Sequence, residues 1–130
     1  FGQLDYVHAM TDVTGFGLLG HLSEMCSGSG LTAEVWYDAV PRINGVEDYL
    51  AQGAVPGGTK RNWHSYGHRV EKLKEKYRFL LCDPQTSGGL LVSIDPGHRK
   101  DFEAVLQAHG LPAMPIGQMN AGIDPIQVVI

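Results

Sequence analysis

The chain has 130 residues, a length that suits one domain with its own hydrophobic core. Hydrophobic residues make up 43% of it and charged residues 18%, a composition that excludes an intrinsically disordered chain. The formal charge is −4 at pH 7 and no apolar run approaches the length of a membrane span, so we expect neither nucleic acid nor a membrane as partner.

The apolar periodicity predicts strands and helices that alternate along the chain. In the first half it gives a strand ending before Thr11, a helix with Leu18, Leu22 and Met25 on one face and Gly28 or Gly30 at its end, a strand over 31–37 ended by Pro41, and a short helix over 46–50. In the second half it gives a turn at 56–59, a short helix over 60–66, a helical stripe of Val70, Leu73, Tyr77 and Leu80, a strand over 88–94 covered on both faces, a helix from Pro96 to Gly110, and strands at 116–119 and 126–130. Elements interleaved in this way predict a sheet with helices on one or both faces.

The most informative segment is 10–21, which reads Met-Thr-Asp-Val-Thr-Gly-Phe-Gly-Leu-Leu-Gly-His. It places Asp12 just ahead of a glycine turn, at Thr14 and Gly15, that opens a helix. The amides at a helix N-terminus can bind an anion, while the carboxylate can hold the cation that accompanies a phosphate. The alternative is an ordinary strand-to-helix connection in which Asp and Thr cap the helix and Gly permits the turn.

A second polar segment precedes the predicted strand over 88–94. Its polar side chains are those of Asp83, Gln85, Thr86 and Ser87, and the glycine pair that follows lets other backbone approach closely. We expect these side chains either to line an active-site cleft or to shape the loop through local hydrogen bonds.

A third polar group follows the glycine pair at 57–58. It consists of Thr59, Arg61 and Asn62, and the guanidinium of Arg61 can contact a phosphate oxygen. The alternative is that these are ordinary surface residues near a glycine turn.

The two cysteines, Cys26 and Cys82, lie far apart and form no Cys-x-x-Cys pair, so the sequence indicates neither a zinc site nor a disulfide framework. A reducing cytoplasm is therefore the expected location, and Cys82 is interpreted as a small buried side chain. The chain opens on Phe1 without an initiator Met, which indicates a fragment of a longer protein.

The segments 8–22, 53–62 and 82–91, taken together and in this order, closely resemble the carboxy-terminal domain of selenophosphate synthetase, also called selenide, water dikinase. This domain belongs to the aminoimidazole ribonucleotide synthetase-like superfamily, and the resemblance covers nearly the whole chain. It implies an α+β fold with a mixed β-sheet layered with α-helices, partly ferredoxin-like. It also implies an enzyme that makes selenophosphate, AMP and phosphate from ATP, selenide and water.

The resemblance further implies that residues 1–130 are a single carboxy-terminal domain of a larger, homodimeric two-domain enzyme. The amino-terminal ATP-binding domain, which carries the reactive Cys or selenocysteine, is absent, so this chain alone should be inactive and contain no catalytic residue. Asp12 corresponds to the carboxylate that the family draws from this domain to bind Mg²⁺. The implied residues at the ATP-binding cleft are Thr14, Gly15, Thr59, Asn62, Asp83, Gln85, Thr86 and Ser87. The alternative function is a non-catalytic dimerisation or regulatory module that retains the fold.

Overall fold

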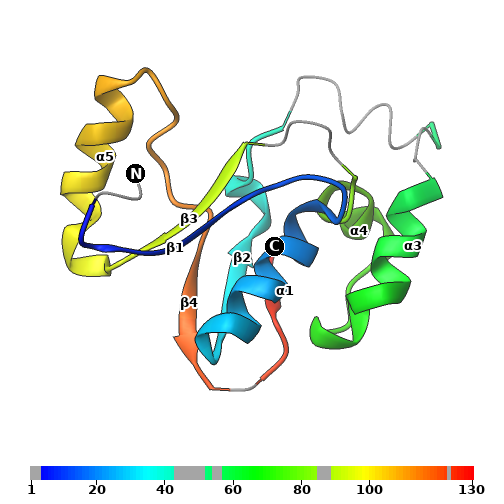
Figure 1. The fold of residues 1–130 in the computed structure, drawn as a ribbon. Helices are drawn as coiled ribbons and strands as arrows, with labels where there is room; N and C mark the ends of the chain where they lie inside the picture. Colours follow the sequence, from blue (N-terminus) through cyan, green and yellow to red (C-terminus); the bar gives the residue numbers. More distant parts are fainter. Residues whose placement is uncertain (1–3, 43–51, 54–56, 85–88, 123) are drawn as a thin grey trace.

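The computed structural model describes residues 4–42, 52–53, 57–84, 89–122 and 124–130, whose strands form two separate sheets (Figure 1). The strands are β1 (Val7–Asp12), β2 (Leu31–Trp36), β3 (Leu90–Ile94), β4 (Gly117–Ala121) and β5 (Gln127–Val129). The helices are α1 (Gly17–Ser29), α3 (Gly57–Tyr66), α4 (Glu75–Leu81) and α5 (Arg99–Ala108), with short 3₁₀ turns at Tyr37–Ala39, Gly67–Arg69 and Pro96–His98. The predicted α+β class is confirmed. None of the helices in the described part of the chain is long and apolar enough to cross a membrane.

Strands β1 and β3 form a two-stranded antiparallel ribbon that runs from α5 to the end of α4 (Figure 1). Ala9 and Leu91 of the ribbon pack toward the hydrophobic core, whereas Met10 and Leu90 are exposed. The prediction that strand 88–94 is covered on both faces is therefore wrong. Within the described residues, β3 pairs only with β1, and its outward face meets solvent.

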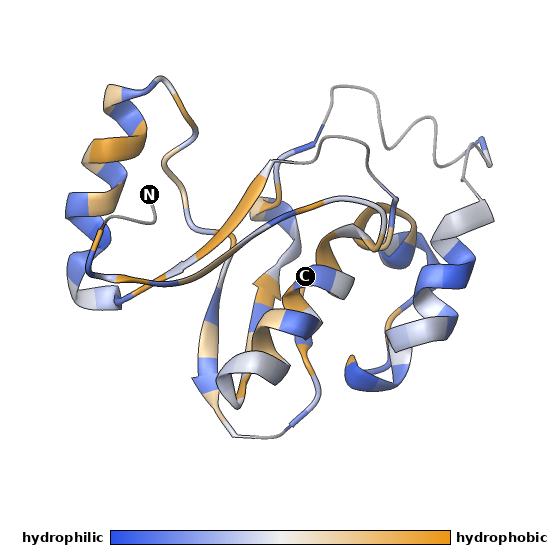
Figure 2. Cartoon of the chain, viewed as in Figure 1, coloured by the Kyte–Doolittle hydropathy of each residue, from blue (hydrophilic) through white to orange (hydrophobic). Residues whose placement is uncertain are grey.

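The second sheet has the order β4-β2-β5, with β2 antiparallel to β4 and parallel to β5. Its central strand is half-buried, as the alternation over 31–37 predicts, and it contributes Ala33 and Val35 to the core. Helix α1 lies beside β2 and supplies the predicted apolar face of Leu18, Leu22 and Met25 (Figure 2). The core thus lies around α1, between it and the strands.

Glycine ends α1 as the sequence predicts. Gly30 is the residue after the helix, has a left-handed backbone with φ of 68°, and donates its N–H to the carbonyl of Cys26. A residue with a Cβ adopts this conformation only with strain, so glycine is the suitable helix terminator here.

The helical stripe predicted from Val70 onward is wrong for residues 70–74, because the helix, α4, begins only at Glu75. The preceding segment is extended and runs parallel to the chain entering β5. Val70 forms a β-bridge with Ile126, the Glu71 N–H donates to the Ile126 carbonyl over 2.9 Å, and the Glu71 side chain accepts the N–H of Val128. These long-range bonds override the local helical periodicity.

The helix predicted over 60–66 begins earlier in the structure. Helix α3 begins at Gly57, so residues 57–59 are the first turn of a helix rather than the end of a separate turn. The short helix predicted over 46–50 lies outside the described residues.

Candidate functional site

The three polar motifs of the sequence meet around Asn62, a buried residue of α3. Its side-chain amide donates hydrogen bonds of 2.9 Å to the carbonyl oxygens of Gly15 and Cys82. The turn after β1, the middle of α3 and the end of α4 are thereby joined, and Figure 1 shows these segments side by side. Residues that are far apart in the sequence thus form one site.

The turn after β1 is held tightly against the end of α4 at Gly17. This residue has φ of 73°, and a Cβ placed on it would lie 2.7 Å from the carbonyl carbon of Cys82. Its N–H donates to the carbonyl of Thr14 over 3.0 Å. Only glycine fits both the left-handed backbone and this close approach.

Helix α1 begins without a side-chain cap among the described residues, so capping does not account for Asp12 and Thr14. Its N-cap residue is Phe16, and no side chain bonds the first helical amides. The alternative in which Asp12 and Thr14 serve as caps is therefore not what the structure contains. The carboxylate and the hydroxyl are placed by the strand and the turn instead.

Asp12 is the last residue of β1 and its side chain is exposed. The strand alternates between inward and outward residues, so Asp12 lies on the outward face, directly opposite Leu90 in the register. Its carboxylate has no hydrogen-bond or ion-pair partner among the described residues. An exposed carboxylate supplies the hard oxygen ligand that Mg²⁺ prefers, so the residue fits this metal.

Asp12 does not belong to a preformed metal centre within the part of the chain that the structure describes. Over residues 4–42, 52–53, 57–84, 89–122 and 124–130, no three or more His, Cys, Asp or Glu side chains gather closely enough to hold a metal. Since Mg²⁺ takes about six oxygen ligands, a magnesium ion at Asp12 requires ligands from water, from a substrate or from another part of the polypeptide.

Thr14 and Gly15 are exposed and lie at the surface of the turn. The Thr14 hydroxyl is 3.2 Å from Nε2 of the buried His21, within hydrogen-bonding distance. The other ring nitrogen of His21 is 3.8 Å from Glu24, too far for a hydrogen bond. A Cβ built on Gly15 would meet no atom within 4 Å, so the space over the turn is open.

Thr59 and Asn62, in contrast, are buried within α3. Thr59 is only 1% exposed, and its hydroxyl oxygen has no hydrogen-bond partner among the described residues. Asn62 uses its amide nitrogen in the two backbone bonds given above. Arg61, between them in the sequence, is exposed. The polar group after 57–58 is thus divided between interior and surface.

The residues that end α4 are half-buried or buried. Cys82 is completely buried, as the sequence predicts, and burial raises the pKa of its thiol. Burial also raises the pKa of the Asp83 carboxyl. Gln85, Thr86 and Ser87, the other predicted cleft residues of this loop, lie outside the described residues.

Sequence reasoning missed the contribution of Tyr66 to the turn. Its hydroxyl donates a 2.5 Å hydrogen bond to the Phe16 carbonyl, and its ring fills the space that a Cβ on Gly20 would need. That Cβ would lie 2.7 Å from the Tyr66 ring. The available signal was Gly20 itself, because glycine is unfavourable inside a helix unless another group packs closely against it.

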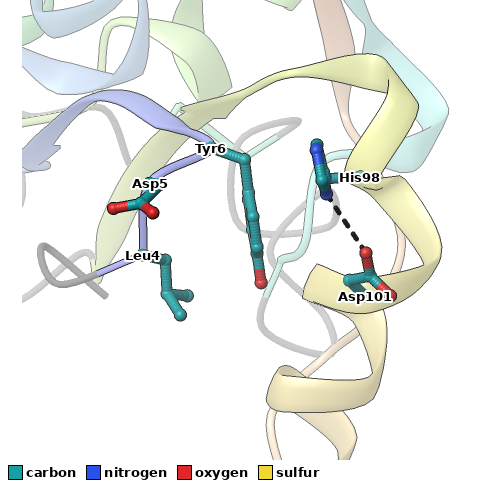
Figure 3. A pocket seen from close by; sticks show the side chains of 5 residues that line it. All are labelled: Leu4, Asp5, Tyr6, His98 and Asp101. Atoms are coloured by element: carbon teal, nitrogen blue, oxygen red, sulfur yellow. Dashed lines mark hydrogen bonds and ion pairs between the residues drawn. The ribbon is translucent and has the colours of Figure 1, made fainter.

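A hollow of about 480 Å³ lies at the opposite end of the β1–β3 ribbon from Asp12 (Figure 3). The rings of Tyr6 and His98 stack there with centroids 4.9 Å apart, and His98 Nδ1 lies 3.1 Å from an Asp101 carboxylate oxygen. Because the ribbon is antiparallel, this hollow adjoins the start of β1 and the end of β3. It is separate from the site around Asn62.

Residues 2–127 match the family model described as AIR synthase related protein, C-terminal domain. The chain is 58% identical over 120 residues to a protein named selenide, water dikinase from Cronobacter sakazakii, and 60% identical over 119 residues to one so named from Pseudomonas aeruginosa. Each alignment covers 92% of this chain and 35% of the relative, so the chain spans about a third of the length of these relatives.

The fold also occurs among solved structures. A thiamine-monophosphate kinase from Stenotrophomonas maltophilia K279a superposes with a TM-score of 0.60 and 18% sequence identity. The superposition covers 95% of this chain and 31% of the kinase. At this identity the likeness establishes the shared fold alone.

Proposed function

This chain belongs to the family of AIR synthase related C-terminal domains, and we propose that it is the carboxy-terminal domain of a selenophosphate synthetase. The full-length enzyme would make selenophosphate, AMP and phosphate from ATP, selenide and water. Identities of 58% and 60% over nine-tenths of the chain support this substrate class, because they are far higher than the 18% shared with the thiamine-monophosphate kinase. By itself this chain would be inactive, since ATP binding depends chiefly on an amino-terminal domain.

The observation that carries the proposal is the exposed carboxylate of Asp12 beside an open glycine turn. An exposed carboxylate is normally solvated by water, so the feature that points to a metal is the position of Asp12, at the end of β1 and next to the open turn. Asp12 has no hydrogen-bond or ion-pair partner in the described part of the chain and adjoins the exposed residues Thr14 and Gly15. It is therefore available as a magnesium ligand, and Mg²⁺ supplies the positive charge that cleavage of ATP phosphates requires.

Asp12 belongs to no group of three or more candidate ligands among the described residues, which favours a magnesium site shared with the amino-terminal domain. Asp12 would contribute one ligand, and the amino-terminal domain and the ATP phosphates would contribute the others. Thr14 and Gly15 would border the phosphates, and so would Asp83 with Gln85, Thr86 and Ser87. Thr59, whose buried hydroxyl has no partner among the described residues, would lie beneath the phosphates in α3. Asn62 would act by holding the turn and the end of α4 in position.

The remaining expectations rest on the family resemblance. The full-length enzyme would be a homodimer in the cytoplasm. The two cysteines, both buried and free, are compatible with a reducing compartment.

The test is the reaction of the full-length protein with ATP and Mg²⁺, with and without selenide, under anaerobic conditions. AMP is measured by chromatography and selenophosphate by phosphorus NMR. We expect both products only when selenide is present, and no diphosphate product when thiamine monophosphate replaces selenide. A full-length protein that consumes no ATP with selenide would contradict the proposal and favour the non-catalytic module.

A further inference from the structure

A buried histidine contacts the turn that follows Asp12. His21, in the second turn of α1, is only 7% exposed, and its Nε2 is 3.2 Å from the exposed hydroxyl of Thr14. The ring of Phe16 lies against the imidazole, with centroids 5.7 Å apart. Because a hydroxyl has a single proton, the state of the His21 ring determines whether Thr14 donates a hydrogen bond inward or outward.

The other ring nitrogen of His21, Nδ1, is buried and has no hydrogen-bond partner among the described residues. It lies 3.8 Å from a carboxylate oxygen of Glu24, three residues later on the same helix. The Glu24 side chain is 59% exposed, so it has the freedom to move within hydrogen-bonding distance by a small rotation. Nδ1 of His21 thus faces a negative charge.

This carboxylate favours one of the two neutral forms of the imidazole. A neutral imidazole carries one N–H and one nitrogen lone pair. A lone pair on Nδ1 would be buried without a donor and repelled by Glu24, whereas an N–H on Nδ1 is attracted to it. The proton therefore belongs on Nδ1, and the lone pair belongs on Nε2, which faces Thr14.

The lone pair on Nε2 fixes what the Thr14 hydroxyl offers to a ligand. The hydroxyl donates its proton to Nε2, so its oxygen lone pairs remain for the open side of the turn. The backbone of the turn is also held, since the Thr14 carbonyl accepts the Gly17 N–H over 3.0 Å. A phosphate oxygen is an acceptor and cannot bond such a hydroxyl, whereas a cation or a metal-bound water can.

We propose that His21 is a positioning residue that directs the Thr14 oxygen toward the hydrated magnesium ion at Asp12. Glu24 fixes the tautomer of His21, and His21 fixes the direction of the Thr14 proton. The inference rests on the proposed function for the presence of the metal, whereas the direction of the hydroxyl depends on this chain alone. Thr14 is then an oxygen acceptor on the metal side of the site and makes no direct bond to a phosphate.

Nitrogen NMR of the 130-residue chain with isotope-labelled histidine tests the tautomer in the absence of metal and nucleotide. Long-range proton–nitrogen correlation spectra distinguish a protonated ring nitrogen from an unprotonated one. The signals that disappear in His21→Gln assign His21 among the six histidines. At about pH 8, above the usual pKa range of histidine, we expect a proton on Nδ1 and none on Nε2. A proton on Nε2 would overturn the proposal.

The contribution of Glu24 is tested in the same spectra. In Glu24→Gln, the uncharged amide can either donate to Nδ1 or accept from it, so the population with a proton on Nε2 should rise several-fold. Glu75→Gln removes the same charge at an exposed position of another helix, α4, and should leave the tautomer unchanged. An unchanged tautomer in Glu24→Gln would contradict the proposal, because the carboxylate would then not select it.

A double-mutant cycle in the full-length protein tests whether His21 acts through Thr14. Thr14→Val removes the hydroxyl with little change of shape, and His21→Leu removes its acceptor. Each should raise the Mg²⁺ concentration required for selenide-dependent AMP formation by about tenfold. The double variant should require no more Mg²⁺ than Thr14→Val, since His21 acts only through that hydroxyl. Effects that multiply in the double variant would contradict the proposal.

A matched variant separates positioning from a purely structural role. His21→Gln retains a carbonyl oxygen that can accept the Thr14 proton, so it should recover part of the Mg²⁺ affinity lost in His21→Leu. Thermal unfolding shows whether each variant is folded. Equal Mg²⁺ requirements for folded His21→Gln and wild type, together with an equal requirement for folded His21→Leu, would show that the ring has no such role.

The outcomes for this inference and for the proposed function are distinguishable, because the tautomer is measured without ATP or selenide. A proton on Nδ1 of His21 in a protein that forms no selenophosphate would support the direction of the Thr14 hydroxyl and contradict the proposed function. Selenophosphate formation by a protein with the proton on Nε2 would do the reverse.

Discussion

Asn62 donates a hydrogen bond of 2.9 Å to the carbonyl of Gly15, across 47 residues of sequence. The same amide bonds the carbonyl of Cys82, so one buried side chain connects the turn after Asp12 to the loop that begins at Asp83. The position of the exposed carboxylate relative to its neighbouring loops therefore depends on a residue that is itself buried.

Replacement of Asn62 by alanine should destabilise the chain. Both carbonyls would lose their donor in a buried environment, and we expect the free energy of unfolding to fall by about 2 kcal/mol or more. Urea unfolding of the 130-residue chain measures the change. Ser65→Ala, at an exposed position of the same helix, is the control and should change the free energy by less than about 0.5 kcal/mol. Equal stabilities for the two variants would show that the Asn62 bonds do not hold the turn.

Two glycines of α1 should respond in opposite directions to alanine. In Gly17→Ala, the alanine would have to adopt the left-handed backbone of Gly17, and its Cβ would overlap the Cys82 carbonyl group. We therefore expect the free energy of unfolding to fall by about 2 kcal/mol or more. Gly28 has open space around it and no left-handed backbone, so Gly28→Ala should stabilise the chain by about 0.5 to 1 kcal/mol. Thermal and urea unfolding of both variants measure the pair. A stable Gly17→Ala protein would contradict the close approach described here.

The sequence predicted much of the fold because most elements depend on local signals. The periodicity of Leu18, Leu22 and Met25 identified α1, and the glycine after it identified its end. The alternation over 31–37 identified β2. These signals lie within a few residues of the element that they predict, so no tertiary information was needed.

The errors arose where distant contacts determine the structure. Residues 70–74 have a helical pattern, but the backbone bonds between Glu71 and Ile126 make them extended. Strand β3 has the apolar run of a doubly covered strand, although its outward face is open in the structure described.

The candidate site was predictable in composition but not in arrangement. The motifs named Asp12, Thr14 and Gly15, which the structure places together at one exposed turn. They did not distinguish the exposed Arg61 from the buried Thr59 and Asn62, because helix orientation depends on packing. The contribution of Tyr66 had no motif, since its bond to Phe16 spans 50 residues.

The stability of the chain should depend on pH through Asp83. Burial raises the pKa of this carboxyl, so the folded chain retains the proton at pH values where the unfolded chain has lost it. With respect to Asp83, the folded chain is therefore most stable below the usual pKa range of Asp, where the carboxyl is protonated in both states. Part of this stability is lost as the pH rises through the raised pKa of the folded chain. Asp83→Asn removes this loss.

Urea midpoints of the wild-type chain and of Asp83→Asn, measured from about pH 3 to about pH 7, test this linkage. We expect the stability of the variant relative to the wild type to increase with pH across the acidic range and then to level off. A difference that is constant with pH, or one that decreases, would show that the Asp83 carboxyl is not destabilised by burial.

The magnesium requirement of the full-length protein tests the central claim most directly. Asp12→Asn keeps the size of the side chain but removes its charge, and Asp38→Asn is the matched control at an exposed aspartate outside the site. Selenide-dependent AMP formation is measured as Mg²⁺ is varied at saturating ATP. We predict that Asp12→Asn raises the required Mg²⁺ concentration by about tenfold or more, or abolishes turnover, while Asp38→Asn has no effect. Identical magnesium curves and turnover for the two variants would contradict the assignment of Asp12 as a metal ligand.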